Sequence, residues 1–360
     1  MCDNELDIFL ADESVSVVEA MKKIDDNIRG ILFIADTERH LIGSVTDGDI
    51  RRWLIETGDL TAKVSQFMNV SSKYLCFGDK EKAKSYMNEH QLSALPILDS
   101  NMRIKEIIFD TDVLNAVSSK KDAISDISVI IMAGGKGNRL YPYTKILPKP
   151  LIPIGDIPII ERIINRFCEY GISEFYITVN YKKGMIKSYF NELNPSYKMN
   201  YVEEEKPLGT AGSIKMIREK FKTPIIITNC DVLIDADYEN IIKFHKKSGN
   251  DLTIVSALKN IVVPYGVLHT KEQGLVTNMQ EKPRLSYFIN TGMYIMNPEW
   301  IEKIPDNTFF HMTDLVNVLM TEKRRVGMYP VSENSFLDMG EFEEMHRMEK
   351  RLNLESGQEI

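Results

Sequence analysis

The pattern of apolar and polar positions divides the chain into two regions. From residue 128 onward, short and almost continuous apolar runs alternate with segments that repeat apolar residues every three or four positions. Continuous runs are typical of strands buried on both faces, and the periodic segments are typical of amphipathic helices. The predicted strands lie at 129–132, 174–180, 199–202 and 224–228, and the predicted helices at 159–170, 184–193 and 211–221.

This alternation predicts an α/β domain of Rossmann-like type. Its sheet should be mixed and mainly parallel, with helices on both faces. Because ligands bind at the carboxyl ends of the strands in such sheets, we expect functional motifs directly after the strands.

The first third of the chain contains an internal repeat. The pattern of residues 34–50 recurs 63 residues later, at 97–113. Each copy reads as strand, polar turn, strand and helix, with Asp49 or Asp112 as the predicted N-cap. A unit of about 60 residues buries little core alone, so the two α+β copies should pack together. Further helices are predicted before the copies, at 14–25 and 80–90.

Polar residues separate the two regions. The stretch before residue 128 shows no apolar period and suits a linker. The expected segments are 1–62, 63–117, a linker at 118–127, and 128–360.

Charge changes the picture of possible partners. The chain of 360 residues has a net charge of −8; residues 1–127 hold 23 acidic and 15 basic residues, and residues 128–360 hold 29 of each. Neither region has the basic excess that nucleic-acid binding requires, so no nucleic-acid partner is expected.

Cysteine spacing and the N-terminus bear on location. The four cysteines are far apart and match neither a zinc site nor a disulfide framework. The N-terminus is acidic, and no apolar run approaches the about 18–20 residues of a membrane span. We expect a cytoplasmic protein without a membrane partner.

The first repeat carries a short motif, Gly43-Ser44-Val45-Thr46-Asp47-Gly48-Asp49. With the duplication, it makes residues 1–115 resemble a tandem pair of CBS domains, which sense adenine nucleotides. The resemblance implies that Thr46 and Asp49 hold a ribose, with Arg51 and Arg52 near the phosphates. Thr46 and Asp49 also suit a simple capping turn. The second copy departs from the pattern, because Phe109 stands at the hydroxyl position.

A glycine-rich loop follows the first strand of the second region. It reads Ala133-Gly134-Gly135-Lys136-Gly137-Asn138-Arg139. Its glycines let backbone N–H groups approach phosphate oxygens, and Arg139 adds a cation. The loop lacks a Walker ending, and a proline-rich segment rather than a helix follows it. In that segment, four prolines within 148–159 fix the position of Lys149.

The glycine loop followed by Pro148-Lys149-Pro150-Leu151 resembles the sugar-1-phosphate nucleotidyltransferases, over residues 128–347. These enzymes join a nucleoside triphosphate to a sugar 1-phosphate and release pyrophosphate. The resemblance implies that Arg139 binds the β- and γ-phosphates and Lys149 the α-phosphate. Asn138 departs from the Thr or Ser that is usual in the family.

Further family positions are present in the same order. The resemblance implies that Asp231 and Asp338 bind Mg²⁺, a cation that accepts a few carboxylates beside water and phosphate. It assigns Glu281 to the sugar hydroxyls and Lys282 to the sugar phosphate. The remaining implied sugar-site residues are Tyr265, Gly266 and Asn290, and we add Phe336 beside the metal ligand. Singly, each of these motifs also suits a turn, a cap or a surface acid.

The charge of the reactants indicates how catalysis would proceed. A phosphate dianion must attack a highly anionic triphosphate, so positioning and charge neutralisation carry the reaction. Arg139, Lys149, Lys282 and the metal would supply the positive charge. The phosphate is already ionised, so no general base is expected, and His245, His269, His311 and His346 lie outside the motifs.

The segment 203–212 should determine which nucleotide base the enzyme binds. Relatives that read uracil or thymine place Gln five residues before Gly209, where this chain has Glu204. An ionised carboxylate only accepts, and guanine presents two adjacent donors, so Glu204 favours GTP. Pro207, Gly209 and Thr210 should complete the base site. The three successive acids 203–205 also suit a solvated turn.

The sugar is inferred from architecture alone. A CBS pair ahead of a guanylyltransferase resembles the bacterial glucosamine-1-phosphate guanylyltransferases of legionaminic acid (nonulosonate) synthesis, which implies a hexosamine 1-phosphate partner. Alternatives are mannose 1-phosphate with GTP, or glucose 1-phosphate with UTP or dTTP. A catalytically silent nucleotide sensor is a further alternative. CBS pairs commonly associate, so a homodimer or larger homo-oligomer is expected.

Overall fold

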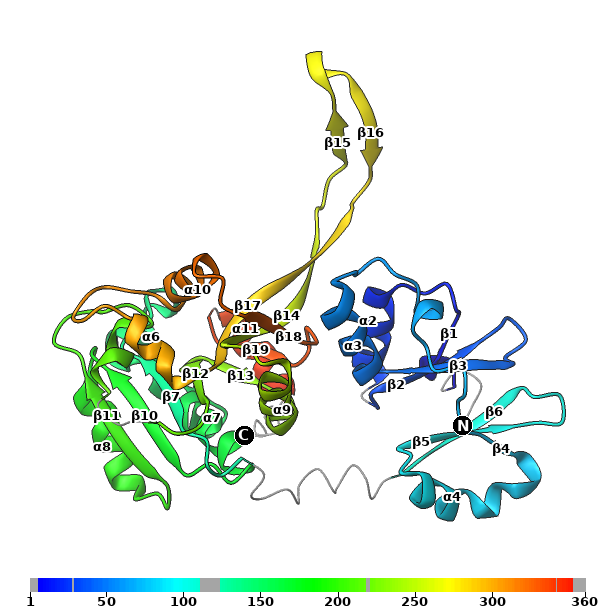
Figure 1. Cartoon of the computed structure of the whole chain (residues 1–360), viewed down its shortest axis with the longest axis horizontal. Coiled ribbons are helices and arrows are strands. Elements are labelled where there is room, and N and C mark those ends of the chain that lie inside the picture. The colour runs from blue at the N-terminus through cyan, green and yellow to red at the C-terminus, as the bar shows by residue number, and fades with distance from the viewer. Residues whose placement is uncertain (1–5, 28, 111–123, 218–220, 341, 352–360) are drawn as a thin grey trace, which may run out of the picture. The chain divides into compact units, whose positions relative to one another are not determined.

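The computed structural model describes residues 6–27, 29–110, 124–217, 221–340 and 342–351 (Figure 1). The chain forms two compact units. The first comprises Met1–Ser119 and Leu258–Phe288, and the second comprises Lys120–Ala257 and Ile289–Ile360. Within the described residues, no helix combines the length and the apolar character needed to span a membrane.

The first unit contains two small sheets built in the same way. In each, a two-residue strand pairs in parallel with a central strand, which pairs antiparallel with a third. The sheets consist of β1 (Leu10–Ala11), β2 (Ile31–Ala35) and β3 (Leu41–Thr46), and of β4 (Leu75–Cys76), β5 (Ala94–Leu98) and β6 (Ile104–Phe109). The helices are η1 (Asp7–Phe9), α2 (Val17–Asn27), α3 (Asp47–Thr57), η2 (Val64–Gln66), η3 (Phe77–Lys82) and α4 (Ala83–His90).

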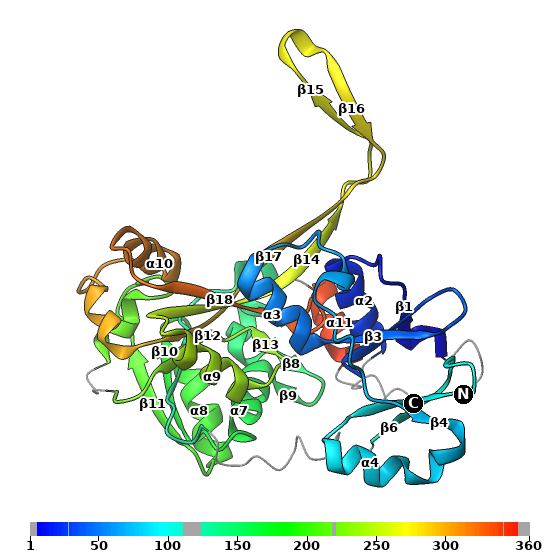
Figure 2. The same ribbon diagram turned by 45° about the vertical axis from the view of Figure 1, so that its right-hand side comes forward.

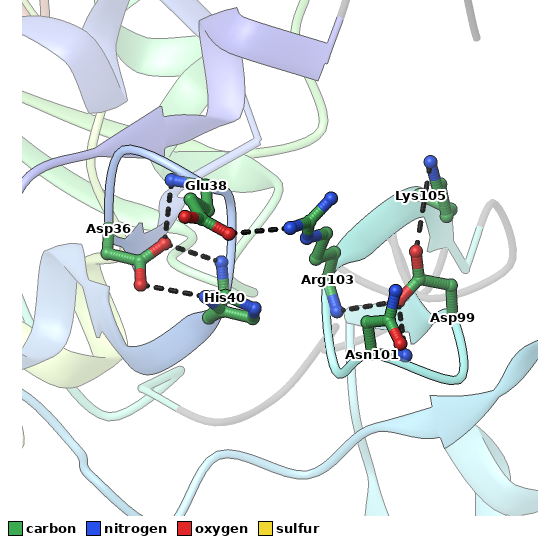
Figure 3. A network of polar contacts seen from close by, with 7 residues as sticks. All are labelled: Asp36, Glu38, His40, Asp99, Asn101, Arg103 and Lys105. Atoms are coloured by element: carbon green, nitrogen blue, oxygen red, sulfur yellow. Dashed lines mark hydrogen bonds and ion pairs between the residues drawn. The ribbon is translucent and has the colours of Figure 1, made fainter.

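Equivalent turns of the two copies confirm the repeat (Figure 3). The Asp36 carboxylate accepts hydrogen bonds from the backbone N–H groups of Glu38 and His40, both at 2.9 Å. Sixty-three residues later, the Asp99 carboxylate accepts from Asn101 at 2.8 Å and from Arg103 at 3.0 Å. These carboxylates accept hydrogen bonds from backbone N–H groups that would otherwise have no partner in a tight turn.

The two copies pack together, as predicted. Buried apolar residues of both copies, among them Phe33 and Ile107, form one cluster. The two turns also meet, because Glu38 pairs with Arg103 at 2.5 Å (Figure 3). In addition, the Ile104 N–H donates to the Arg39 carbonyl at 2.9 Å.

Helix boundaries in the first unit differ from prediction. The helix predicted at 14–25 is α2, shifted to Val17–Asn27. The one predicted at 80–90 begins as the 3₁₀ turn η3 and becomes α-helical only at Ala83. Asp112, the predicted N-cap of the second copy, lies outside the described residues.

The first unit also includes a β-hairpin, drawn in yellow in Figure 1. Strands β15 (Val267–Thr270) and β16 (Val276–Gln280) pair antiparallel, with the 3₁₀ turn η8 (Glu272–Gly274) between them. Several of its apolar side chains are exposed: Leu268, Leu275, Val276 and Met279.

A seven-stranded mixed sheet forms the second unit, in the order β11-β10-β7-β12-β17-β14-β18. Its strands are β7 (Val129–Ala133), β10 (Glu174–Val179), β11 (Lys198–Glu203), β12 (Ile225–Asn229), β14 (Leu252–Val262), β17 (Arg284–Met296) and β18 (Val326–Val331). Four neighbouring pairs run parallel, and β12 and β17 run antiparallel. The mixed, mainly parallel sheet confirms the predicted fold class.

Shorter elements and helices complete the second unit. The helices are α6 (Tyr143–Ile146), α7 (Ile159–Cys168), α8 (Lys183–Leu193), α9 (Tyr238–Ser248), α10 (Met312–Thr321) and α11 (Phe342–Arg351). Small sheets pair β8 (Pro153–Ile154) with β9 (Ile157–Pro158), and β13 (Val232–Ile234) with β19 (Phe336–Asp338). The 3₁₀ turns are η5 (Asn138–Leu140), η6 (Lys149–Leu151), η7 (Gly212–Met216) and η9 (Pro298–Lys303).

The central strand β7 is buried on both faces, as its continuous apolar run predicted. Val129 and Ile131 pack in the cluster that includes α7, α8 and α9. Ile130 and Met132 point the other way, into the cluster that includes α10. Figure 2 shows α10 apart from α7, α8 and α9, which lie together lower in the view. This alternation follows from the two-residue period of a strand.

The parallel register brings several strand ends to one edge of the sheet. Val179 at the end of β10 aligns with Ala133 and Glu203, the last residues of β7 and β11. Asn229, which ends β12, aligns with Met132. The segments that follow these strands therefore emerge together.

One prediction for the second unit is wrong. The segment 211–221 was expected to be a helix, but it forms only the 3₁₀ turn η7, and residues 218–220 lie outside the described residues. The N–H groups of Ala211 and Gly212 both donate to the Phe310 carbonyl, at 2.9 and 3.1 Å. These contacts hold the start of the segment against a distant one, and the 3₁₀ turn ends after Met216, where the backbone of Ile217 is extended.

Candidate active site

A cavity of about 450 Å³ lies at this edge of the sheet. Of the ten predicted nucleotide-binding residues, only Ala133 does not line the cavity, because it is buried at the end of β7. The lining residues come from the glycine-rich loop, the strand ends and two later segments: Met132, Gly134, Gly135, Gly137, Asn138, Arg139, Lys149, Thr178, Glu204, Pro207, Gly209, Thr210, Asn229, Cys230, Asp231, Phe309 and His311.

Two glycines of the loop permit close packing around the cavity. Gly137 has φ of 68°, and a Cβ there would lie 2.9 Å from the Cβ of Lys149. A Cβ on Gly134 would lie 2.6 Å from Oε1 of Glu204. A side chain at Gly137 would be strained, and one at either position would push apart groups that the resemblance assigns to phosphate and base.

Lys149 and Asp231 form a largely buried ion pair inside the cavity. Their side chains are 11% and 13% exposed. Lys149 opens the 3₁₀ turn η6 after Pro148, and Asp231 follows the end of β12. The ammonium therefore lies beside a carboxylate, in a position where an anionic ligand or a cation would compete for the same partners.

Asp338 lies close to this pair. Val232 pairs with Asp338 across β13 and β19, and the Met339 N–H donates to the Asp231 carbonyl at 2.8 Å. Burial, and then the charge of Asp231, raise the pKa of Asp338 above its ordinary value, while Lys149 and Arg139 oppose that shift. Two carboxylates thus disfavour each other's charge in a site of limited solvation.

This donor set fits a small divalent cation. Mg²⁺ needs one or two protein carboxylates when water and phosphate oxygens fill its other positions. A cation between Asp231 and Asp338 would relieve the repulsion that raises the Asp338 pKa. Across the described residues, no group of three or more metal-binding side chains occurs.

Glu204 is buried at the side of the cavity, with 4% of its surface exposed. Its Oε2 accepts a hydrogen bond from the Leu208 N–H at 3.2 Å. Burial is the main cause that raises the pKa of Glu204, and the Leu208 bond opposes it. Oε2 of Glu204 therefore stabilises the loop that contains Leu208, while Oε1 faces Gly134.

Sequence reasoning missed a segment of the cavity wall. Phe309 and His311 line the cavity, although the histidines had been placed outside the motifs. The Thr210 N–H lies 3.4 Å from Nδ1 of His311, across 101 residues of sequence. No local sequence pattern predicts such a contact. Four other lining residues were also missed: Met132 and Thr178 are next to last in their strands, Asn229 ends a strand, and Cys230 follows it.

Two predicted sugar-site residues of the second unit lie outside the cavity lining. Phe336 is paired with Ile234 in the small sheet. Asn290 donates to the Tyr294 hydroxyl at 2.6 Å and accepts from the Gly292 N–H at 3.0 Å. A Cβ on Gly292 would lie 2.3 Å from Nδ2 of Asn229, so the backbone at Gly292 packs closely against a residue that lines the cavity.

The other four predicted sugar-site residues come together in the first unit. The Lys282 N–H donates to the Tyr265 carbonyl at 3.3 Å. A Cβ on Gly266 would lie 2.9 Å from Oε2 of Glu281. These residues thus form one cluster at the base of the hairpin, and their meeting with the nucleotide cavity stays a prediction.

The predicted ribose site of the first CBS copy forms a capping box. Thr46, not Asp49, is the N-cap of α3, so that prediction is wrong. The Thr46 N–H and hydroxyl donate to the Asp49 carboxylate at 2.9 and 2.6 Å, and the Asp49 N–H donates back at 3.2 Å. Arg51 pairs with Asp47, and Arg52 with Asp49.

Phe109 explains the departure in the second copy. Its ring packs against Phe9 at 4.8 Å, and the Arg29 guanidinium lies 4.9 Å from its centre. An aromatic side chain thus fills the place where the family motif has a hydroxyl.

Comparisons with known proteins agree with this two-part organisation. The protein-family profile described as "Nucleotidyl transferase" matches residues 128–354, and the profile described as "CBS domain" matches residues 5–56. The second CBS copy is supported by its strand order and equivalent turn.

Named relatives match about half of the chain. A mannose-1-phosphate guanyltransferase of Debaryomyces hansenii is 35% identical over 49% of this chain and 51% of its own length. A UTP–glucose-1-phosphate uridylyltransferase of Synechocystis sp. is 34% identical over 50% of this chain and 51% of its own length. The chain therefore spans about half the length of these relatives.

A solved structure is also similar. HddC from Yersinia pseudotuberculosis is 25% identical, with a TM-score of 0.51, over 63% of this chain and 99% of that one. Its almost complete coverage indicates that the fold around the cavity is shared as a whole.

Proposed function

The chain belongs to the nucleotidyl transferase family, and from that premise we propose that it makes GDP-glucosamine from GTP and glucosamine 1-phosphate. A phosphate oxygen of the sugar attacks the α-phosphorus of GTP, a new P–O bond forms, and the bond to the β-phosphate breaks to release pyrophosphate. The product would serve the synthesis of legionaminic acid.

One observation carries this proposal: the glycine-rich loop, Lys149, Asp231 and Glu204 surround a single cavity. Glycine N–H groups and Lys149 suit phosphates, and Glu204 suits the base. Charge neutralisation and positioning are the main sources of rate in phosphoryl transfer. Arg139 and Lys149 would provide that charge on the nucleotide side, and Lys282 would provide it on the sugar phosphate.

The metal is part of the proposal. Asp231 and Asp338 would hold Mg²⁺, which would stabilise the negative charge that develops on the phosphates. Lys149, whose ammonium pairs with Asp231, would bind the α-phosphate.

The choice of guanine rests on Glu204. Its Oε1 is the oxygen not bonded to Leu208, and a carboxylate oxygen can accept from N1–H or the amino group of guanine. The relatives include both guanylyl and uridylyl enzymes, so the base needs a direct test.

The sugar has one strong competitor. Mannose 1-phosphate is the substrate named for several guanylyl relatives, and none of the predicted sugar-site residues lines the cavity to distinguish it from glucosamine 1-phosphate. Glucosamine 1-phosphate is favoured here only by the CBS pair that precedes the transferase region.

The CBS pair is proposed as a regulatory module for adenine nucleotides. Asp49 would accept from the ribose hydroxyls, and Arg51 and Arg52 would exchange their present carboxylate partners for phosphates. We further propose assembly of the chain into a homodimer or larger homo-oligomer.

The first test measures pyrophosphate release with GTP, UTP, dTTP, CTP and ATP against hexose and hexosamine 1-phosphates. We expect GTP with glucosamine 1-phosphate to be fastest, and a chelator to abolish turnover until Mg²⁺ is restored. A faster reaction with mannose 1-phosphate would contradict the proposed sugar substrate. A faster reaction with UTP would contradict the proposed nucleotide. Absence of release in every combination would leave only the sensor alternative.

Substitution of Glu204 tests the base assignment. Glu204→Gln should lower kcat/KM for GTP by about tenfold or more, because one acceptor is exchanged for a donor facing guanine donors. Glu205→Gln is the matched control, since Glu205 is exposed and does not line the cavity. Equal effects of the two substitutions would remove Glu204 from base recognition.

A further inference from the structure

A second segment of the chain completes the wall of the base site. Thr308–Met312 lies directly against the loop 208–212. The Phe310 N–H donates to the Leu208 carbonyl at 2.9 Å, and the Phe310 carbonyl accepts from Ala211 and Gly212. The Met312 N–H donates to the Thr210 hydroxyl at 2.9 Å. The two segments are therefore joined along their length.

The contact between these segments leaves no room for side chains. A Cβ on Gly209 would lie 2.5 Å from the Phe310 carbonyl oxygen, and one on Gly212 would lie 2.5 Å from the Thr308 carbonyl oxygen. Gly209 also has φ of 78°. The two glycines thus serve a backbone-to-backbone contact that fixes where the segment stands.

Successive side chains of the segment have different surroundings. Phe310 packs against the hydrophobic cluster below the sheet, whereas Phe309 and His311 line the cavity. Phe309 is 59% exposed although it lines the cavity, so part of its side chain is accessible to a ligand there. It meets the His311 ring edge to face, with centres 4.8 Å apart and planes at 83°.

From this placement we propose that Phe309 stacks on the base of the bound nucleotide and that His311 is a positioning residue for its ring. The proposal rests on the proposed nucleotidyltransfer function. An exposed aromatic face beside Glu204, Pro207 and Gly209 offers an apolar surface to a flat base. Stacking of a base on an aromatic side chain is worth about 1–3 kcal/mol by alanine substitution.

The contacts of His311 explain how its imidazole keeps the Phe309 ring in place. Its Nδ1 lies 3.4 Å from both the backbone nitrogen and the hydroxyl of Thr210. Because the backbone N–H can only donate, Nδ1 is the acceptor and the proton of the neutral imidazole is on Nε2. The ring is also fixed at its base, where His311 caps α10 together with Asp314.

The test compares Phe309→Ala with Phe309→Trp. Phe309→Ala should raise the KM for the preferred nucleotide about tenfold and leave kcat within about twofold, while Phe309→Trp should keep the wild-type KM. Inorganic triphosphate, which has no base, should inhibit wild type and Phe309→Ala equally. Phe77→Ala is the matched control, since Phe77 is 61% exposed and lies in the first unit.

The role of His311 is tested with His311→Asn, because Asn also caps helices but lacks the ring. It should raise the nucleotide KM about threefold, and the double variant with Phe309→Ala should be no worse than Phe309→Ala alone. Additive effects would overturn the positioning role.

An unchanged nucleotide KM in Phe309→Ala would overturn the stacking role. The role would also be overturned if Phe309→Ala weakened inhibition by inorganic triphosphate as much as it weakened nucleotide binding. Failure of the proposed function is seen separately. If another nucleotide is preferred over GTP, the comparison is made with that nucleotide. If wild type releases no pyrophosphate, calorimetric titration with GTP replaces KM as the measure of stacking.

Discussion

At the scale of single residues, a buried imidazole couples the stability of the second unit to pH. His245 is 1% exposed; its Nδ1 lies 2.8 Å from the Thr253 hydroxyl and its Nε2 lies 3.1 Å from Oδ1 of Asn297. Burial lowers the pKa of His245 below its ordinary value, against a weaker opposing effect of the Asn297 bond. The neutral ring is therefore the form that fits.

The sign of the pH effect follows from that shift. Below about pH 6.5 the unfolded imidazole takes up a proton that the folded one resists, so the free energy of unfolding falls as the pH is lowered. His245→Gln should flatten the dependence of Tm on pH between about 7 and 5. His346→Gln is the control, because His346 is exposed on α11 and lies outside this buried network. Parallel profiles of wild type and His245→Gln would contradict the assignment.

Some site residues can be predicted one by one from sequence, and others cannot. The glycines, Arg139 and Lys149 lie within 17 positions of one another and directly follow a strand that its apolar run reveals. His311 contacts Thr210 only because two segments 101 residues apart in sequence are adjacent in the fold. Asp49 was misplaced for a smaller reason: Thr46 and Asp49 can both cap a helix, and the box uses both.

At the scale of elements, the antiparallel pair β12 and β17 places a tight contact beside the cavity. Gly292 has φ of 84°, and a Cβ there would lie 2.3 Å from Nδ2 of Asn229, which lines the cavity. A Cβ on Gly327 would meet Asn250 in a similar way, at 2.2 Å, but Asn250 does not line the cavity. The two glycines thus share a close contact with an asparagine amide, but only Gly292 also has a positive φ, which adds strain to any side chain there.

Gly292→Ala and Gly327→Ala should each lower the free energy of unfolding by about 1–3 kcal/mol, because a neighbouring amide must move. Gly292→Ala should also reduce kcat/KM well below that of Gly327→Ala at a temperature where both are folded, since it displaces Asn229 two residues from Asp231. Urea unfolding and steady-state kinetics measure the two effects. Equal activity of the two variants would show that this contact is only structural.

The elements differ in how readily the sequence predicts them. Strand β7 and helix α7 were expected because each carries a complete apolar pattern of its own. The helix expected at 211–221 is replaced at 212–216 by a 3₁₀ turn, which ends where the backbone of Ile217 is extended. Gly212 lowers the helix propensity of this segment, and an apolar pattern alone does not reveal that Ala211 and Gly212 contact Phe310 of a distant segment.

At the scale of the whole molecule, the chain carries the candidate nucleotide cavity in one unit and a duplicated CBS fold in the other. The two CBS copies have the same strand order and the same turn, but only the first keeps a hydroxyl and an acid at Thr46 and Asp49. In the second, Phe109 packs between Phe9 and Arg29. We therefore expect one adenine-nucleotide site in the pair.

Asp49 also has to serve that site from within a capping box. Its carboxylate already accepts from Thr46 and pairs with Arg52, and residues 1–127 carry the whole net charge of −8. A nucleotide must therefore bind against a negative background, and the local cations Arg51 and Arg52 have to outweigh it at short range.

Asp49→Asn tests this site while it preserves an acceptor for the cap. The loss of a charged acceptor for the ribose hydroxyls should weaken binding of ATP or AMP by about tenfold or more, measured by calorimetry on the full chain. Asp112→Asn, at the corresponding position of the second copy, should bind as wild type does. Equal affinities of wild type and Asp49→Asn would remove Asp49 from the site, and an equal loss in Asp112→Asn would mean that both copies contribute. If wild type binds no adenine nucleotide, the CBS pair does not have the proposed sensing role, whatever the transferase cavity does.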